Sequence, residues 1–254
     1  VALLSDGSVL DELESSEGAF AWLCSLEATT ELAELLTVEP PKQAAAAYRQ
    51  LHARAAFVGI ELLTRSRYSD ALCEAFMQEG PGGVGGPLER LWDFVELSTP
   101  EEVDSALSGY FARAAVVLQI RYPQEAAARL RPRAGRLLDG LLRRIHCEPL
   151  AELLLHSLRA KWTCELVFPV TGLVQRLVSI LCEDGPHAFE RQRGARCVME
   201  GLLDQAGALC FRAEFGESLA NSGAVGQLVE VALRGGALAP AAAALVASAA
   251  SRLS

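Results

Sequence analysis

The sequence predicts an all-α protein of the armadillo or HEAT type, a helical-repeat solenoid in which paired helices stack into an α-α superhelix. Three observations support this prediction. The chain is 51% hydrophobic and only 6% aromatic, and much of the apolar content is alanine and leucine, which are strong helix formers. Apolar residues recur at three- and four-residue steps along most of the chain, which indicates amphipathic helices. Two stretches near the C-terminal end also repeat each other.

The internal repeat pairs residues 171–181 with residues 222–232. Gly172 aligns with Gly223 and Leu177 aligns with Leu228, so the two stretches are offset by 51 residues. A repeated helical unit cannot bury its apolar face alone, and neighbouring units therefore stack. Such arrays form long surfaces, and we expect this one to bind partners.

The clearest helix start in the first half of the chain lies near residue 100. Thr99 can cap a helix, Pro100 suits the first turn, and Glu102 completes a capping box. An apolar stripe then runs to Leu118, and the Tyr122–Pro123 step ends it because a residue before proline avoids the helical region.

Two further helices are predicted in the second half, one starting near Pro149 and one over residues 170–181, which the sequence at 183–186 then breaks. The predicted linkers are short and favour antiparallel neighbours. We see no firm boundary, so we predict one α-solenoid domain over residues 1–254. The chain opens at Val1 and stops inside a helical pattern, and we expect it to be a fragment of a longer protein.

The charge and the cysteines of the chain limit the class of partner and the cellular compartment that we expect. The net charge of −9 argues against nucleic acid. The longest uncharged run, 235–251, is 17 residues, and a membrane span needs about 20 strongly apolar ones, so we expect no membrane span. The seven cysteines are scattered, with none in a CxxC pattern. They indicate reduced, mostly packed thiols and a cytosolic or nuclear protein.

No catalytic pattern is convincing. Residues 80–85 match GxGxxG, but a dinucleotide site needs a preceding strand, and residues 75–79 resemble the end of a helix. The four histidines lack the spacing of a zinc site. We find no arrangement of nucleophile, base and orienting group, so we expect a protein that is not an enzyme and that has no cofactor.

Several runs, in order along the chain, resemble the SAPS family of regulatory subunits of phosphatases of the protein phosphatase 6 type. They lie at 32–41, 56–64, 88–95, 107–113, 141–146, 153–155 and 173–178, with Trp162 between the last two. The resemblance implies a non-catalytic helical scaffold that binds a Ser/Thr protein phosphatase catalytic subunit and directs it to substrates and to ankyrin-repeat subunits. Residues 14–20 lack the lysine and asparagine of the family pattern, which indicates a divergent member.

The basic stretch 121–161 carries nine Lys and Arg residues against four Asp and Glu residues. Interfaces favour arginine and tryptophan, and we predict partner contacts from this region and one preceding arginine: Arg113, Arg143, Arg144, Lys161 and Trp162. The alternative is an ordinary solvated helix face. Trp22 and Trp92 are expected in the core, and Trp162 suits either role.

The alternative function is a general armadillo-type interaction adaptor that is not tied to a phosphatase. Armadillo proteins that bind extended peptides use rows of asparagines, and Asn221 is the only asparagine of this chain. This weakens groove binding of peptides but leaves other adaptor roles open.

Overall fold

The computed structural model describes residues 4, 17–65, 68–83, 85–97, 104–160, 162–163, 172–183, 188–203, 223–234 and 239–250. These residues form helices and connecting turns, with no strand among them. The prediction of an all-α protein is therefore confirmed. No helix within the described ranges has both the length and the apolar character needed to cross a membrane.

The chain divides into two compact units, Val1–Pro132 and Arg133–Ser254. Each unit is described by itself below. The division falls in the arginine- and proline-containing turn Arg131–Arg133. The prediction of a single solenoid domain over residues 1–254 stays a prediction.

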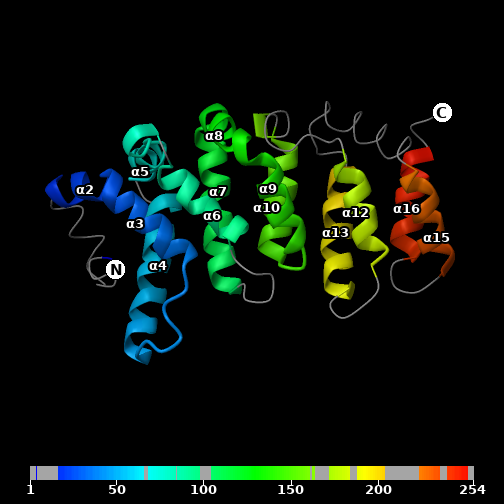
Figure 1. The fold of residues 1–254 in the computed structure, drawn as a ribbon, viewed down its shortest axis with the longest axis horizontal. Coiled ribbons are helices and arrows are strands. Elements are labelled where there is room, and N and C mark those ends of the chain that lie inside the picture. The colour runs from blue at the N-terminus through cyan, green and yellow to red at the C-terminus, as the bar shows by residue number, and fades with distance from the viewer. Residues whose placement is uncertain are drawn as a thin grey trace. The chain divides into compact units, whose positions relative to one another are not determined.

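The described helices of the N-terminal unit pack on one another in two main pairs. α3 packs on α6 and α4 packs on α7, while the shorter α5 and α8 pack beside them. Figure 1 shows these helices in blue to green. Their bounds are α2 Glu17–Leu23, α3 Leu26–Thr37, α4 Ala46–Arg65, α5 Ser69–Phe76, α6 Pro87–Leu97, α7 Ser105–Arg121 and α8 Pro123–Leu130.

Aromatic side chains fill the centre of this unit. Trp92 of α6 and Phe111 of α7 are fully buried, and their rings meet edge to face with centroids 5.3 Å apart. The Phe94 ring also lies beside that of Phe111, tilted to it, with centroids 5.0 Å apart. The prediction that Trp92 lies in the core is confirmed. The same prediction for Trp22 is wrong, because Trp22 on the short α2 helix is 48% exposed.

Helix α7 begins later than the sequence predicts. Asp104 is extended and its carboxylate accepts hydrogen bonds from the backbone N–H groups of Ala106 and Leu107 at 2.8 and 2.9 Å. This is an N-cap, so the helix starts at Ser105. The predicted capping box at Thr99–Glu102 lies outside the described residues. The predicted end at Tyr122 is confirmed, and Pro123 opens α8.

The C-terminal unit is a succession of packed helix pairs. α12 packs on α13 and α15 packs on α16, while α10 packs on α13, α13 packs on α16, and α12 packs on α15. Figure 1 shows these helices in green to red. Their bounds are α9 Ala134–Arg143, α10 Glu148–Arg159, α12 Leu173–Leu181, α13 Ala188–Leu203, α15 Ala224–Arg234 and α16 Ala239–Ala250.

The two stretches that are similar in sequence share local features in the structure. Gly172 and Gly223 precede α12 and α15 and both have positive φ, at 85° and 72°, which glycine adopts at little cost. The aligned Leu177 and Leu228 are both fully buried. Polar contacts also recur between successive helices: Arg176 of α12 pairs with Asp139 of α9 at 2.6 Å, and Gln175 of α12 donates a hydrogen bond to Gln227 of α15 at 3.2 Å.

Helix α13 approaches its neighbours closely through two glycines. A Cβ atom at Gly194 would lie 1.9 Å from the backbone oxygen of Ile145, and one at Gly201 would lie 2.5 Å from a methyl group of Leu155. Arg159 of α10 also donates a hydrogen bond to the backbone oxygen of Gly201 at 2.5 Å. These contacts hold α13 against α10 and the turn that precedes it.

The structure tests the predictions for the glycine-rich loop and for the cysteines. The GxGxxG match at 80–85 follows a helix, α5, and contains a short 3-10 turn, Pro81–Gly83, so it lacks the preceding strand of a dinucleotide site. The described cysteines are free thiols, as expected. Their packing varies, since Cys73 is buried and Cys197 is exposed.

Candidate binding pocket between helices α4 and α7

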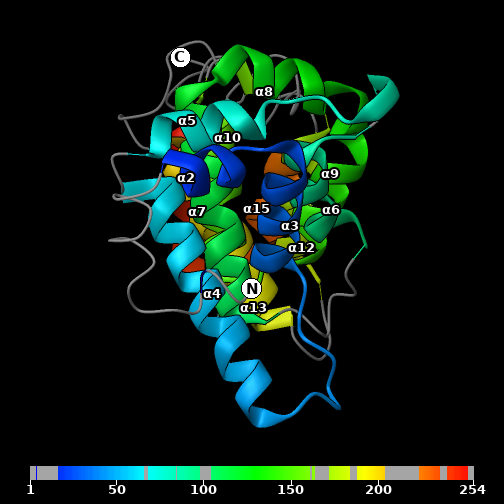
Figure 2. The ribbon, with the colours of Figure 1, turned by 90° about the vertical axis from the view of Figure 1, so that its left-hand side faces the viewer.

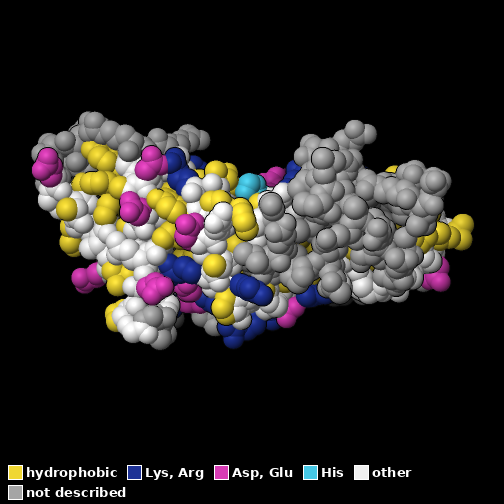
Figure 3. Space-filling view, turned by 90° about the horizontal axis from the view of Figure 1, so that it is seen from above, with side chains coloured by type: hydrophobic (Ala, Val, Ile, Leu, Met, Phe, Trp, Pro, Cys, Tyr) yellow, Lys and Arg dark blue, Asp and Glu magenta, His cyan; other side chains and the backbone are white. Residues whose placement is uncertain are grey.

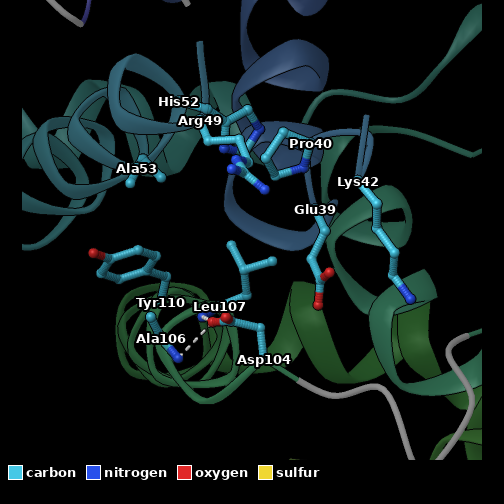
Figure 4. Close-up of a pocket in the computed structure, with 11 residues that line it drawn as sticks. Glu39, Pro40, Lys42, Arg49, His52, Ala53, Asp104, Ala106, Leu107 and Tyr110 are labelled. Atoms are coloured by element: carbon cyan, nitrogen blue, oxygen red, sulfur yellow. Dashed lines mark hydrogen bonds between the residues drawn. The ribbon is translucent and has the colours of Figure 1, made fainter. Parts of the chain in front are cut away.

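A pocket of about 290 Å³ opens in the N-terminal unit between the first half of α4, the start of α7 and the loop that joins α3 to α4. Figure 4 shows Leu107 and Tyr110 of α7 facing Arg49, His52 and Ala53 of α4 across it. The loop contributes the remaining wall. The lining residues are Glu39, Pro40, Lys42, Arg49, His52, Ala53, Ala56, Asp104, Ala106, Leu107 and Tyr110.

The loop exists because prolines interrupt the helical pattern. Pro40 and Pro41 cannot donate backbone hydrogen bonds, and they disfavour the helical conformation in the residue before them. α3 therefore ends at Thr37, Val38 is extended, and a turn closed by the Ala44 N–H and the Pro41 oxygen (2.8 Å) leads into α4. The loop carries Glu39 and Lys42 to the mouth of the pocket.

The first half of α4 projects from the unit. Figures 1 and 2 show this end of the helix reaching beyond α3 and α7. Residues 45–51 are all exposed, and Tyr48 and Leu51 are 44% and 46% exposed. The second half is well packed, with Ile60, Leu62 and Leu63 fully buried. One helix therefore anchors the unit at one end and presents side chains at the other.

His52 lies where the projecting half of α4 meets the packed half. It is only 8% exposed, and its ring lies 6.4 Å from that of Tyr48. Burial lowers the pKa of His52 below its ordinary value of 6.5, because the charged imidazolium loses hydration. The imidazole is therefore neutral near pH 7, and it can donate one hydrogen bond and accept another.

The arginines near the pocket differ from those elsewhere in the unit. The arginines of α6, α7 and α8 all form ion pairs: Arg90 with Glu34, Arg113 with Glu61, Arg121 with Asp70 and Arg129 with Glu89. On α4, Arg49 and Arg54 are exposed and have no ion pair within the described part of the chain. α4 therefore presents positive charge that its neighbours do not neutralise.

The chemistry of the pocket suits binding. Its polar groups are two carboxylates, two cations, a neutral imidazole and a phenol, around the apolar surface of Leu107 and the alanines. The Asp104 carboxylate is already engaged as the cap of α7. Among the described residues no group of three or more His, Cys, Asp or Glu residues could hold a metal ion. These groups can exchange hydrogen bonds and ion pairs with a bound polar molecule.

The residues predicted from the sequence to contact a partner lie elsewhere. Arg113 is half-exposed on α7, and its guanidinium donates hydrogen bonds to Glu61 (2.8 Å) and to the Thr64 hydroxyl (3.1 Å) of α4. Arg143 is exposed at the end of α9, and its backbone oxygen accepts a hydrogen bond from Arg191 at 3.0 Å. Arg113 belongs to one unit and Arg143 to the other, so neither unit contains the whole predicted set.

The prediction for Arg144 is wrong as a surface contact. Arg144 is fully buried, and its Nη1 donates a hydrogen bond to the backbone oxygen of Gly140 at 3.0 Å. Burial, reinforced by the charge of Arg143, lowers the pKa of Arg144. Trp162 is half-buried, and Lys161 lies outside the described residues.

The pocket residues are hard to identify from the sequence. Arg49 and His52 lie on a helix whose first half has no apolar stripe to separate an inner from an outer face, and their partners across the pocket come about fifty residues later in the chain. The useful signal was the prolines at 40 and 41, which place a loop and a new helix start together.

In comparisons with family models, curated proteins and solved structures, no match to this chain was found. The fold and the pocket define the class as an all-helical protein with a polar surface pocket. The family resemblance rests on the residues described under Sequence analysis.

Proposed function

We propose that the protein is a non-catalytic scaffold of the armadillo or HEAT type that binds protein partners. The observation that carries this proposal is the recurrence of packing between equivalent helices. α9, α12 and α15 are joined in turn by the Arg176–Asp139 ion pair and the Gln175–Gln227 hydrogen bond, while α10, α13 and α16 pack in succession. Repeat arrays of this kind serve as extended binding surfaces.

The exposed side chains of the N-terminal unit are consistent with a docking role. Figure 3 shows apolar side chains in separate groups among charged ones over its described part. Among the described residues of this unit, the large exposed apolar ones are Trp22, Val38, Tyr48, Leu51, Phe57 and Ile120. Aromatic side chains surrounded by polar ones are common at protein interfaces.

The partner that we propose is a Ser/Thr phosphatase catalytic subunit of the protein phosphatase 6 type, with ankyrin-repeat subunits as further partners. The support is the ordered set of SAPS-like runs. Several of their residues, including Trp92, Phe111, Leu154 and Leu177, are buried. The runs therefore support a shared helical scaffold, while the choice of partner has to be tested directly.

The experiment is affinity purification of the tagged chain from its source cells under gentle conditions, followed by mass spectrometry. We expect a phosphatase catalytic subunit among the enriched proteins. Arg143→Glu changes an exposed residue and tests the predicted basic contact, whereas Arg144→Glu would place a carboxylate in the interior and test only folding. Recovery of no phosphatase by the wild-type chain would reject this partner.

A general adaptor not tied to a phosphatase is the second candidate. It is favoured by the left-handed glycines before α12 and α15, since a turn followed by a helix opening is common in armadillo repeats. The same purification separates the two candidates, because an adaptor would enrich other proteins reproducibly and no phosphatase.

A further inference from the structure

The exposed half of α4 carries positive charge that the described fold leaves without a partner. Arg49 and Arg54 are exposed and form no ion pair among the described residues, although every arginine of α6, α7 and α8 forms one. Arg49 lines the pocket, whereas Arg54 does not. Guanidinium groups recognise carboxylates and phosphates through paired hydrogen bonds.

The carboxylates that line the pocket do not neutralise Arg49. Asp104 uses one oxygen to accept hydrogen bonds from the N–H groups of Ala106 and Leu107, so its charge faces the positive end of the α7 dipole. Glu39 belongs to the loop and is exposed. In Figure 4 the Glu39 carboxylate points toward the α7 side, away from the Arg49 guanidinium.

The floor of the pocket supplies a second polar contact. His52 is more than nine-tenths buried, lines the pocket, and makes no hydrogen bond through its ring within the described part of the chain. The ring nitrogens of His52 are not among the enclosed side-chain atoms that lack a hydrogen-bond partner, so they are accessible from the pocket. A neutral imidazole donates one hydrogen bond and accepts another, and a polar group bound in the pocket can form one of them.

The size and walls of the pocket limit the occupant. A volume of about 290 Å³ lies just below the range for small-molecule sites, which begins at about 300 Å³. Leu107 and the Tyr110 ring form an apolar wall opposite Arg49. One side chain with a short apolar stem and a charged end fits this combination better than a nucleotide or a flat cofactor.

We propose that this pocket binds an anionic side chain of an extended partner peptide, with Arg49 pairing with the negative group and His52 donating a hydrogen bond to it. The methylene groups of the bound side chain contact Leu107 and Tyr110. The negative group is a carboxylate or a phosphate, which share this chemistry. The inference rests on the proposed role as a protein-binding scaffold and adds the site and the chemical class of its ligand.

The test measures fluorescence anisotropy of labelled short peptides with the full chain. The peptides share one Gly, Ser and Leu background and carry glutamate, phosphoserine or glutamine at the centre. Arg49→Gln is the test variant. Arg54→Gln is the matched control, because Arg54 is an exposed arginine on the same helix that does not line the pocket.

We expect the better of the two anionic peptides to bind the wild-type chain about tenfold more tightly than the glutamine peptide, as one charge-assisted hydrogen bond predicts. Arg49→Gln should remove this preference, and Arg54→Gln should change affinity less than about threefold, as expected for an exposed charge outside the site. The stronger of the two anionic peptides identifies the group as carboxylate or phosphate. Unchanged circular dichroism would show that both variants are folded.

Equal weakening by both substitutions would mean unspecific attraction to a basic helix and would overturn the inference. So would equal binding of all three peptides. The two proposals fail separately. A chain that recovers a phosphatase but shows no preference for anionic peptides loses the pocket and keeps the scaffold role. A chain that binds anionic peptides through Arg49 but recovers no phosphatase keeps the pocket and loses that partner.

Discussion

The close approach of α13 to the turn before α10 gives the sharpest test of the packing in the C-terminal unit. A Cβ atom at Gly194 would lie 1.9 Å from the Ile145 oxygen and 2.7 Å from its carbonyl carbon. Both atoms belong to the backbone and cannot rotate away. Gly194→Ala therefore forces α13 to shift by about 1 Å, and overpacking of this kind costs about 1–3 kcal/mol.

The helix propensity of alanine opposes this cost. Alanine stabilises a helix interior by about 1 kcal/mol relative to glycine, so the net loss of unfolding free energy for Gly194→Ala should be up to about 2 kcal/mol. Gly226→Ala on α15 is the matched control, because its Cβ would meet nothing within 4 Å. The free energy of unfolding of that variant should rise by about 0.5–1 kcal/mol. Gly201→Ala should lie between the two, since its nearest obstacle is a movable Leu155 methyl group.

The assay is urea unfolding of the three variants and the wild-type chain, followed by circular dichroism, with amide hydrogen exchange to locate the loss. We expect the order of stability to be Gly226→Ala, wild type, then Gly194→Ala, with faster exchange in α10 and α13 of the last. If Gly194→Ala were as stable as Gly226→Ala, α13 would not approach Ile145 as described and the packing argument would fail.

Three further predictions concern the N-terminal unit. Arg129 is largely buried, and its Nε donates a hydrogen bond to Glu89 at 2.7 Å and its Nη1 donates one to the Met77 oxygen at 2.8 Å. Arg129→Ala should lower the free energy of unfolding, measured in urea, by about 3 kcal/mol. A loss below about 1 kcal/mol would contradict a buried ion pair. Burial tends to raise the pKa of Glu89, but hydrogen bonds from Arg129 and the backbone lower it overall, so this stabilisation is present above the ordinary Glu pKa and is lost as the pH falls through the lowered one. Burial lowers the pKa of His52, so the chain should lose stability as the pH falls below 6.5 toward the lowered pKa. Thermal unfolding between pH 7.5 and pH 5 should show a smaller loss for His52→Gln than for the wild type. An identical pH dependence in the variant would argue against a buried imidazole. Trp92→Ala should cost about 3–5 kcal/mol because it empties the core, whereas Trp22→Ala should cost much less because Trp22 is 48% exposed, and similar unfolding midpoints for the two would refute the assignment.

Helices with strong apolar periodicity could be predicted from the sequence. α10 and α12 begin close to where prolines and glycines indicate, and the repeat at Gly172 and Gly223 corresponds to equivalent helices. Apolar periodicity identifies the inward face of a helix whatever that face packs against. Burial could therefore be predicted for residues whose position on an amphipathic helix decides it.

The failures concern properties that depend on distant neighbours. Arg144 lies beside Arg143 in sequence, yet one is buried and the other exposed, because the turn after α9 directs their side chains differently. Tryptophan is usually a core residue in such folds, but Trp22 lies on the short helix α2 and is half exposed. The pocket joins Arg49 with Tyr110 across two helices, and no local pattern specifies that juxtaposition.

The succession of α10, α13 and α16 has a mechanical consequence. Among the described helices of the C-terminal unit, each pair contacts the pair next to it in sequence, and an array with only nearest-neighbour contacts is expected to melt progressively rather than all at once. Val178 is fully buried, while the equivalent Val229 is 38% exposed and Leu233 is 81% exposed. Among the described residues, α15 is therefore less well covered than α12, and a molecule that covers Val229 and Leu233 should delay the unfolding of α15 and α16.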